Sequence, residues 1–324
     1  MPKQLEIEIG LVAFPGAQLA AIHGLIDLFG IANRFAAERT DLNSPVLKVG
    51  QWRIDEAKGL LVRDNSPVNV HEELPMVAIL PPCLGDPLTR EEAAPFTAWL
   101  VERHRAGAII ASVCGGAFLL GETGLLAGRS VTTHWALADA FGERFPNVAL
   151  DIDRLLIDDG DILSAGGMMA WTDLGLKLVD RFLGPAVMGD TARFLLVDPP
   201  GREQRYYSTF VPKLTHGDAA VLKVQHWLQA TGAKDMTLAV LANQAGLEER
   251  TFLRRFRKAT GMTAIDYCQR LRIGKAREML QFGSMAVDAI AWDVGYSDPG
   301  AFRKIFCRVT GLTPGEYRRR FGAG

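Results

Sequence analysis

The chain has 324 residues, of which 48% are hydrophobic and 23% charged. It contains no apolar run of about 18 residues or more, which argues against a membrane span, and its length and composition favour two domains of a soluble, globular protein. Residues 1–211 carry 18 Lys+Arg against 27 Asp+Glu, a net −9, whereas residues 212–324 carry 18 against 10, a net +8. A basic module joined to an acidic one favours a nucleic-acid-binding domain attached to a domain with another role.

The chain starts MPKQLEIEIG, which goes directly into strand-like alternation and lacks the layout of a secretory signal, so we expect a cytoplasmic protein. Apolar runs predict strands at 6–14, 46–52, 76–80 and 108–113. Helical patterns lie near 17–35, 91–105, 115–124, 135–144, 168–183 and 186–195. Asp-Gly between two apolar runs predicts a tight hairpin within 155–165. The alternation predicts a doubly wound, flavodoxin-like α/β domain.

Segment 197–217 contains three prolines and two glycines without a hydrophobic period, which is typical of a linker. We therefore expect an α/β domain at 1–196, a linker at 197–217 and an all-α domain at 218–324. The four cysteines of the chain are far apart and have no paired spacing. This arrangement predicts neither a disulfide framework nor a metal site, and we expect no cofactor.

Two segments of the basic half, 241–267 and 290–317, resemble each other. Each has Leu or Ile followed by Ala, a Gly four residues after that Ala, then aromatic and basic residues and a Thr-Gly-x-Thr sequence. The glycines, Gly246 and Gly295, fit the turn between two short helices, where a positive φ is needed. The pattern predicts two helix-turn-helix units, bridged by a helix over 268–281.

On these motifs, residues 218–321 resemble the DNA-binding domain of AraC/XylS-family transcription regulators. The resemblance implies double-stranded DNA as a partner and two recognition helices that enter major-groove segments about 34 Å apart. It implies that the following residues face the DNA, some of them contacting only phosphates: Glu248, Glu249, Arg250, Thr251, Arg254, Arg255, Ser297, Asp298, Pro299, Arg303 and Lys304. Their neighbours Phe252, Phe256, Phe302 and Phe306 recur at helical spacing and are predicted to lie in the core.

Cys114 follows the strand at 108–113 and precedes two glycines and a helix, so a sharp turn would place it at the carboxyl edge of the sheet. His134 follows 20 residues later. The stretch GAFLLGETGLLAGRSVTTHW resembles ThiJ/PfpI-type domains of the class-I glutamine-amidotransferase-like superfamily, in the subgroup fused to AraC-type DNA-binding domains. Many ThiJ/PfpI proteins carry an acidic residue after the first strand that poises the cysteine. The aligned position here carries Leu19, so we expect a binding pocket without catalysis.

Ligands of open α/β sheets bind at the carboxyl ends of the strands. The predicted pocket residues are those that follow these ends: Pro81, Pro82, Cys83, Cys114, Gly115, Gly116, His134, Met168 and Trp171. Three other interpretations of Cys114 stay open. It could be the nucleophile of a hydrolase or glyoxalase-like enzyme, a redox-active thiolate with Cys83 as its partner, or an inert buried thiol.

The sequence thus predicts a cytoplasmic, sequence-specific DNA-binding regulator of transcription, in which the acidic domain senses a small-molecule metabolite. The family resemblance implies an activator that contacts RNA polymerase. We also expect a homodimer formed through residues 1–211, because paired DNA sites gain from two linked modules.

Overall fold

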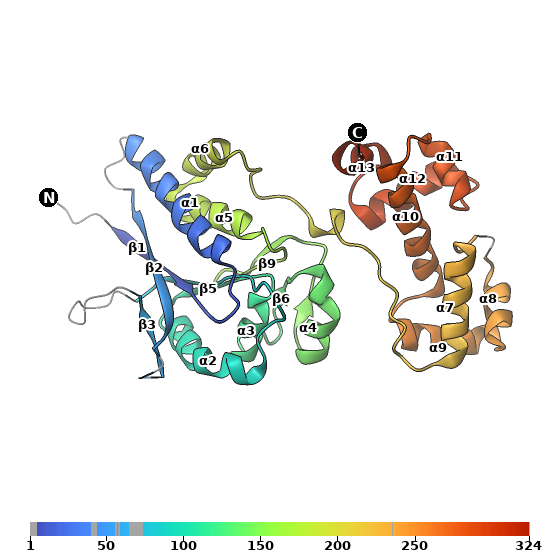
Figure 1. Ribbon diagram of the computed structural model, residues 1–324, viewed down its shortest axis with the longest axis horizontal. Helices are drawn as coiled ribbons and strands as arrows, with labels where there is room; N and C mark the ends of the chain where they lie inside the picture. Colours follow the sequence, from blue (N-terminus) through green and yellow to red (C-terminus); the bar gives the residue numbers. More distant parts are fainter. Residues whose placement is uncertain are drawn as a thin grey trace. The chain divides into compact units, whose positions relative to one another are not determined.

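The described residues are 5–39, 44–55, 57, 59–64, 74–234 and 236–323 of a computed structural model (Figure 1). Contacts between residues divide the chain into two units, Met1–Gln204 and Arg205–Gly324. The predicted linker at 197–217 spans this division.

A mixed sheet forms the centre of the first unit. Its strands, in the order in which they lie side by side, are β3 (Leu60–Arg63), β2 (Val46–Asp55), β1 (Glu6–Val12), β4 (Val77–Leu80), β5 (Ile109–Val113), β9 (Ile162–Ala165) and β8 (Leu156–Asp158). The five inner strands are parallel, and the two edge strands are antiparallel to their neighbours. The inner order is that of flavodoxin-like sheets, so the predicted fold class is confirmed.

Four of the inner strands and the β8–β9 hairpin agree with the strand and hairpin predictions. The sequence pattern missed β3, which is only four residues long and lies at an edge of the sheet. It also missed β6 (Ser130–Val131) and β7 (Ala149–Leu150), a separate two-stranded ribbon.

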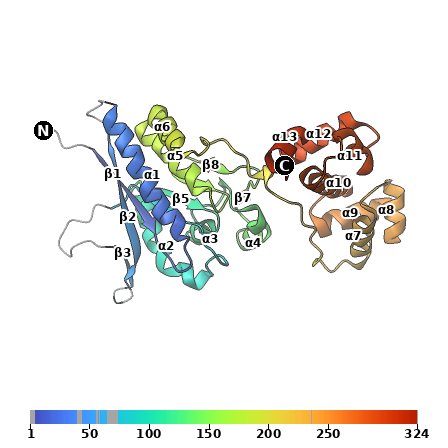
Figure 2. The same ribbon diagram turned by 45° about the horizontal axis from the view of Figure 1, so that its top comes forward.

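Helices cover both faces of the sheet (Figures 1 and 2). One layer consists of α1 (Leu19–Glu38), α5 (Trp171–Leu183) and α6 (Pro185–Leu195), and the other contains α2 (Arg90–Arg105) and α3 (Gly116–Glu122). The short helices η1 (Trp135–Leu137) and α4 (Ala138–Arg144) follow β6. A continuous apolar core lies between these layers and the sheet, as the all-apolar β4 requires.

Among the described residues, α1 is the one helix long and apolar enough to cross a membrane by length and composition. It packs against β2, α5 and α6, and buries Ile22, Leu25 and Phe29 among other residues. A core helix of an α/β domain has the same composition, because its apolar side faces the sheet.

The second unit is helical. Its helices are α7 (Ala219–Thr231), α8 (Leu238–Ala245), α9 (Glu249–Thr260), α10 (Ala264–Phe282), α11 (Val287–Asp293), α12 (Pro299–Thr310) and α13 (Pro314–Phe321), preceded by the single turn η2 (Gln204–Tyr206), which starts at the last residue of the first unit. Gly246 and Gly295 have φ of 66° and 88° at the turns before α9 and α12. The two predicted helix-turn-helix units are therefore confirmed, with α9 and α12 as their second helices.

The two helix-turn-helix units also repeat each other in their cores. Phe252, Phe256, Phe302 and Phe306 are fully buried, as predicted. Phe256 meets the ring of Tyr267 edge-on at 5.3 Å between centroids, and Phe306 meets Tyr317 in the same way at 5.6 Å.

An ion-pair network ties three segments of the first unit together at the start of β9. Asp161 accepts hydrogen bonds from both terminal nitrogens of Arg129, at 2.6 and 2.9 Å, and lies 2.6 Å from Nε2 of His104. The bonds from Arg129, followed by that from His104, hold the pKa of Asp161 well below its usual range. The folded state is therefore stabilised above the unfolded pKa of about 3.9, and this stabilisation is lost as the pH falls.

We predict that Asp161→Asn lowers the free energy of unfolding at pH 7 by about 1 kcal/mol, a value that allows for the partial exposure of the network. Urea unfolding of wild type and variant between pH 7 and pH 3 measures the difference, which should shrink as the pH falls. Asp27→Asn on the exposed side of α1 is the charge-matched control and should change the free energy of unfolding little. A difference that stays constant down to pH 3 would contradict the assignment.

Candidate ligand site and DNA-binding surface

The carboxyl ends of β1 and β4 meet where the order of the parallel strands reverses. Ala17, after β1, forms an antiparallel bridge with Cys83, after β4, and the N–H of Gln18 donates to the carbonyl of Pro82 at 2.7 Å. Pro81, Pro82 and Cys83 are all buried. This reversal point is where open α/β sheets bind ligands.

Cys114 stands at the end of β5, on the sharp turn into α3. Its φ is 54°, a left-handed conformation that costs a residue with a Cβ roughly 1 kcal/mol or more. Two hydrogen bonds hold this conformation: the N–H of Cys114 donates to the carbonyl of Ala165 at 2.7 Å, and its carbonyl accepts from Oγ1 of Thr133 at 2.7 Å.

The two glycines after Cys114 allow a close approach of backbone segments. A Cβ on Gly115 would lie 2.2 Å from Sγ of Cys83, and a Cβ on Gly116 would lie 2.5 Å from the carbonyl oxygen of Leu80. Only glycine fits at either position. The structure therefore brings together Cys83, Cys114, Gly115 and Gly116, four of the residues predicted for the pocket.

The chemistry of Cys114 is that of a neutral thiol. The residue is only 3% exposed, and this burial raises the pKa of the thiol to about 11. Burial also raises the pKa of the Cys83 thiol. A thiolate is the nucleophilic and oxidisable form of cysteine, so both a nucleophilic and a redox role are disfavoured at neutral pH.

His134 is half-buried at the start of η1, directly after Thr133. Its Nδ1 accepts a hydrogen bond from the N–H of Ala136 at 3.1 Å, and burial lowers the pKa of the ring. The neutral ring therefore carries its proton on Nε2, which can donate but cannot accept a proton. His134 is in this state unsuited to act as a general base.

The position aligned with the family's acidic residue is exposed. Leu19 is 64% exposed on α1, whereas Gln18 before it is 7% exposed. Oε1 of Gln18 is buried and has no hydrogen-bond partner among the described residues. Gln18 is thus the buried polar side chain of this loop, and an amide cannot ionise.

Met168 and Trp171 lie beyond the end of β9, at the start of α5. Met168 is 37% exposed. The ring of Trp171 packs against α1, where a Cβ on Gly24 would lie 2.4 Å from the ring. This contact explains the glycine at position 24 of α1, and it gives Trp171 a packing role between α1 and α5.

The last residue of the first unit, Gln204, is anchored beside the Cys114 turn. Gln204 is 2% exposed, and its Nε2 donates to the carbonyls of Thr133 and Ile152 at 2.9 and 3.0 Å. Its Oε1 accepts from the N–H of Trp135 at 2.8 Å. Since Thr133 also binds Cys114, hydrogen bonds connect the Cys114 turn to the residue that precedes the helical unit.

The residues that follow Gln204 are held within the helical unit. Arg277 of α10 donates to the carbonyl of Tyr206 at 2.7 Å and to that of Ser208. Arg320 of α13 donates to the hydroxyl of Tyr207 at 2.7 Å. The chain on both sides of the Gln204–Arg205 peptide bond is therefore fixed by hydrogen bonds within its own unit.

The predicted DNA-facing residues lie on or just before α9 and α12. Those that are exposed are Glu248, Glu249, Arg250, Arg254, Ser297, Asp298, Arg303 and Lys304, and those that are partly buried are Thr251, Arg255 and Pro299. Arg254 and Lys304 occupy equivalent positions, two residues after Phe252 and Phe302. Both face away from the core.

Several of these residues have structural partners. Arg255 makes two hydrogen bonds to Asp218, the N-cap of α7, at 2.7 and 2.9 Å. Arg303 pairs with Asp288 of α11. Asp298 caps α12 by accepting from the N–H groups of Gly300 and Ala301, which lowers its pKa. Capping alone explains an aspartate at that position.

Sequence reasoning missed part of the exposed surface of these helices. Arg257 and Lys258 lie one turn after Arg254 on the exposed side of α9, and Arg308 lies one turn after Lys304 on α12. If the helical period is continued from Arg250 and Arg254, the sequence alone identifies Arg257 and Lys258.

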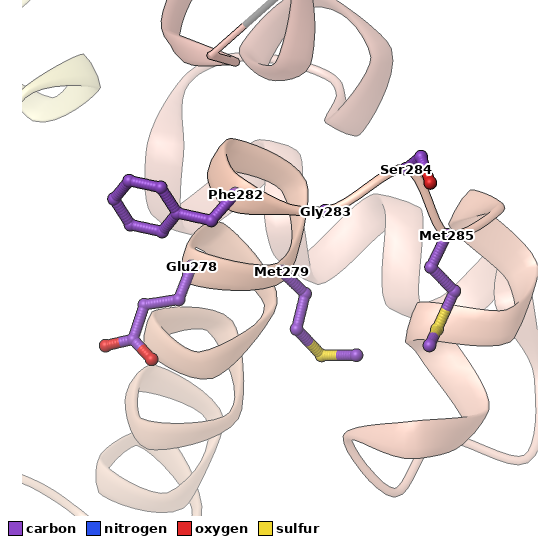
Figure 3. A pocket seen from close by; sticks show the side chains of 6 residues that line it. All are labelled: Glu278, Met279, Phe282, Gly283, Ser284 and Met285. Atoms are coloured by element: carbon purple, nitrogen blue, oxygen red, sulfur yellow. The ribbon is translucent and has the colours of Figure 1, made fainter.

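An open pocket lies at the end of α10, with a volume of about 680 Å³ (Figure 3). Met279 and Met285 face the same open space in this view, whereas Phe282 points to the other side of the helix. The pocket shares no residue with either predicted site. Within the described part of the chain, no group of three His, Cys, Asp or Glu residues is placed to hold a metal ion.

Comparison with known proteins assigns both units. Residues 25–181 match the DJ-1/PfpI family, and residues 241–320 match a helix-turn-helix domain. The HTH-type transcriptional regulator GlxA of Rhizobium meliloti is 28% identical over 74% of this chain and 74% of its own length. In Pseudomonas aeruginosa, the HTH-type transcriptional regulator CdhR is 25% identical over 95% of this chain and 87% of its own length. The HTH-type transcriptional regulator ArgR of the same organism is 30% identical over 69% of this chain and 68% of its own length.

We predict that Cys114 reacts slowly with iodoacetamide at pH 7, because a thiol of pKa about 11 is ionised in only about one molecule in ten thousand. Mass spectrometry of the alkylated protein measures the rate at each cysteine, and the exposed Cys307 serves as the internal reference. Labelling of Cys114 should accelerate as the pH rises from 7 to 10. Faster labelling of Cys114 than of Cys307 at pH 7 would show a reactive thiolate and contradict the assignment.

Proposed function

Because the chain belongs to the AraC-type transcriptional regulators that carry a DJ-1/PfpI domain, we propose that a small molecule bound in its α/β unit controls how this DNA-binding regulator acts on transcription. The named relatives are transcriptional regulators. The proposal has three parts, which concern the DNA surface, the ligand site and the connection between them.

For the DNA surface, we infer that the exposed sides of α9 and α12 enter the major groove. Arg250, Arg254 and Lys304 present cationic groups there, and Arg257, Lys258 and Arg308 extend the same surfaces. Phosphate contacts by such residues set the position of the protein, while contacts to base edges carry the specificity. Arg255, which is paired with Asp218, has a positioning role in this proposal.

For the ligand site, we infer binding without turnover at the carboxyl ends of β1, β4 and β5. The neutral Cys114 thiol, the engaged Nδ1 of His134 and the amide of Gln18 support this. A nucleophilic mechanism needs a thiolate or a base that can accept its proton. The buried and unpartnered Oε1 of Gln18 supports a ligand that donates a hydrogen bond.

The connection is the observation that carries the proposal. Thr133 donates to Cys114 through its hydroxyl and accepts from Gln204 through its carbonyl. Gln204 immediately precedes the helical unit. A ligand that shifts the Cys114 turn would thus disturb the anchor of the segment that leads to the DNA-binding helices.

Further parts of the proposal rest on the family. We infer a cytoplasmic homodimer, since two linked DNA-binding units gain affinity for paired sites, and light scattering on the full chain tests its mass. As an activator it would contact RNA polymerase, which pull-down of the purified enzyme on operator DNA tests.

We predict that the full chain selects a specific duplex from a random-sequence DNA pool, and that its affinity falls steeply with salt because phosphate contacts release counterions. Arg254→Ala should weaken binding to the selected duplex by about 1–3 kcal/mol and relax the preference for one base. Lys223→Ala on α7 removes one positive charge elsewhere in the unit and should have a small effect. Salt-independent binding, or equal losses for both variants, would contradict the proposed surface.

We predict that Gln204→Ala separates ligand binding from the DNA response. A thermal-shift screen of the full chain against metabolites identifies a ligand, which stabilises the protein by about 2.7 kcal/mol at 100 times its Kd. The variant should keep this stabilisation, but the ligand should no longer change its affinity for the selected duplex. The exposed Gln229→Ala should behave like wild type. A Gln204→Ala protein with a full DNA response would show that the signal takes another route.

A further inference from the structure

The two helix-turn-helix units have separate apolar cores that share one helix. On α10, the residues Ala264, Tyr267, Cys268 and Leu271 pack into the first core, with α7, α8 and α9. The residues Ile273, Ala276, Met279 and Leu280 pack into the second core, with α11, α12 and α13. The change from one core to the other occurs at residue 272.

Arg272 occupies this position and binds segments that pack with each of the two cores. Its Nε donates to the carbonyl of Ala233, just after α7, at 2.8 Å, and its Nη1 donates to the carbonyl of Gly295 at 3.1 Å. Gly295 is the turn of the second helix-turn-helix unit, with a φ of 88°. The Arg272 guanidinium also lies 5.4 Å from the centroid of the Tyr296 ring, where a cation is attracted.

The same two segments touch directly beside Arg272. A Cβ on Gly295 would lie 3.4 Å from Cζ of Arg272 and 3.5 Å from Cα of Lys234. Asp293 pairs with Lys275 at 3.2 Å and with Lys234 at 3.5 Å. The bond from Lys275, followed by its charge and that of Lys234, lowers the pKa of Asp293, so this carboxylate is ionised at neutral pH.

We propose that Arg272, with the Lys234–Asp293–Lys275 ion pairs, is a clamp that fixes the spacing and the angle between the two recognition helices. Arg272 is then a positioning residue for DNA recognition, since it binds the turn between α7 and α8 and the turn that precedes α12. The proposal rests on the proposed use of both helices on DNA, and it adds the element that sets which spacing of half-sites is accepted.

The sequence of α10 explains why a clamp is needed. Gly274 lies inside the helix, two residues after Arg272, and the space around its Cα is open. Glycine lacks the side chain that restricts the backbone, so α10 is least stiff near Arg272. Bending there would change the separation of α9 and α12, and the clamp opposes this bending from both sides.

The experiment measures how strongly DNA binding depends on the spacing between the two half-sites. Wild type selects a duplex from a random pool, and two base pairs are then inserted between the two protected segments, which rotates one segment by about 70° relative to the other. Binding of full-length wild type to both duplexes is compared with that of Arg272→Ala. Arg270→Ala removes the same charge from the same helix, where Arg270 lies 6.0 Å from the Phe210 ring, and is the matched control.

We expect the insertion to weaken binding of wild type and of Arg270→Ala by at least about 30-fold, because the contacts of one helix are lost. Arg272→Ala should bind the original duplex about tenfold more weakly than wild type but lose less than about fivefold on insertion. A merely destabilised protein would keep the full penalty. The same penalty in Arg272→Ala as in wild type overturns the clamp.

A second pair of variants keeps the test decisive if Arg272→Ala does not fold. Asp293→Asn removes the ion pairs at a half-exposed position and should also relax the spacing penalty. Gly274→Ala stiffens α10 and, in the Asp293→Asn background, should restore the penalty. Failure of both effects overturns the proposal. A wild type without any spacing penalty would instead contradict the use of two recognition helices.

Discussion

The close contact between the ends of β4 and β5 is the constraint on which the first unit depends. Gly115 and Gly116 leave no room for a Cβ between the Cys114 turn and the Leu80–Cys83 segment. This packing buries Cys114 in a left-handed conformation and keeps its thiol neutral. The architecture of a nucleophilic turn is thus present, and the packing that forms it also raises the pKa of the Cys114 thiol.

The same turn is tied to the chain that leaves the unit. Thr133 binds Cys114 on one side and Gln204 on the other, and Gln204 is almost completely buried. A buried amide that makes several hydrogen bonds is costly to displace, because each broken bond leaves an unsatisfied group. In the helical unit, Arg272 and Arg277 similarly bind backbone carbonyls of distant segments.

Local patterns in the sequence predicted the fold well. Patterns only a few residues long were enough to predict the buried strand β4, the turns at Gly246 and Gly295 and the buried phenylalanines of the repeats. The structure places Cys83 beside the Cys114 turn. At the position compared with the family's acid, Leu19 is exposed and its neighbour Gln18 is buried, a difference that the sequence pattern did not show. Gln204 and Arg272 could not be found, since the partners named above lie 23 to 71 residues away and no local period marks them.

We propose that the α/β unit binds a ligand without converting it and passes the effect to the DNA-binding helices. The most direct measurement incubates the full chain and its operator duplex with a ligand from the thermal-shift screen, and follows DNA affinity and the amount of ligand together. The account predicts that DNA affinity changes while the ligand is recovered chemically unchanged. Conversion of the ligand that stops in Cys114→Ser, together with loss of the DNA response, would contradict it.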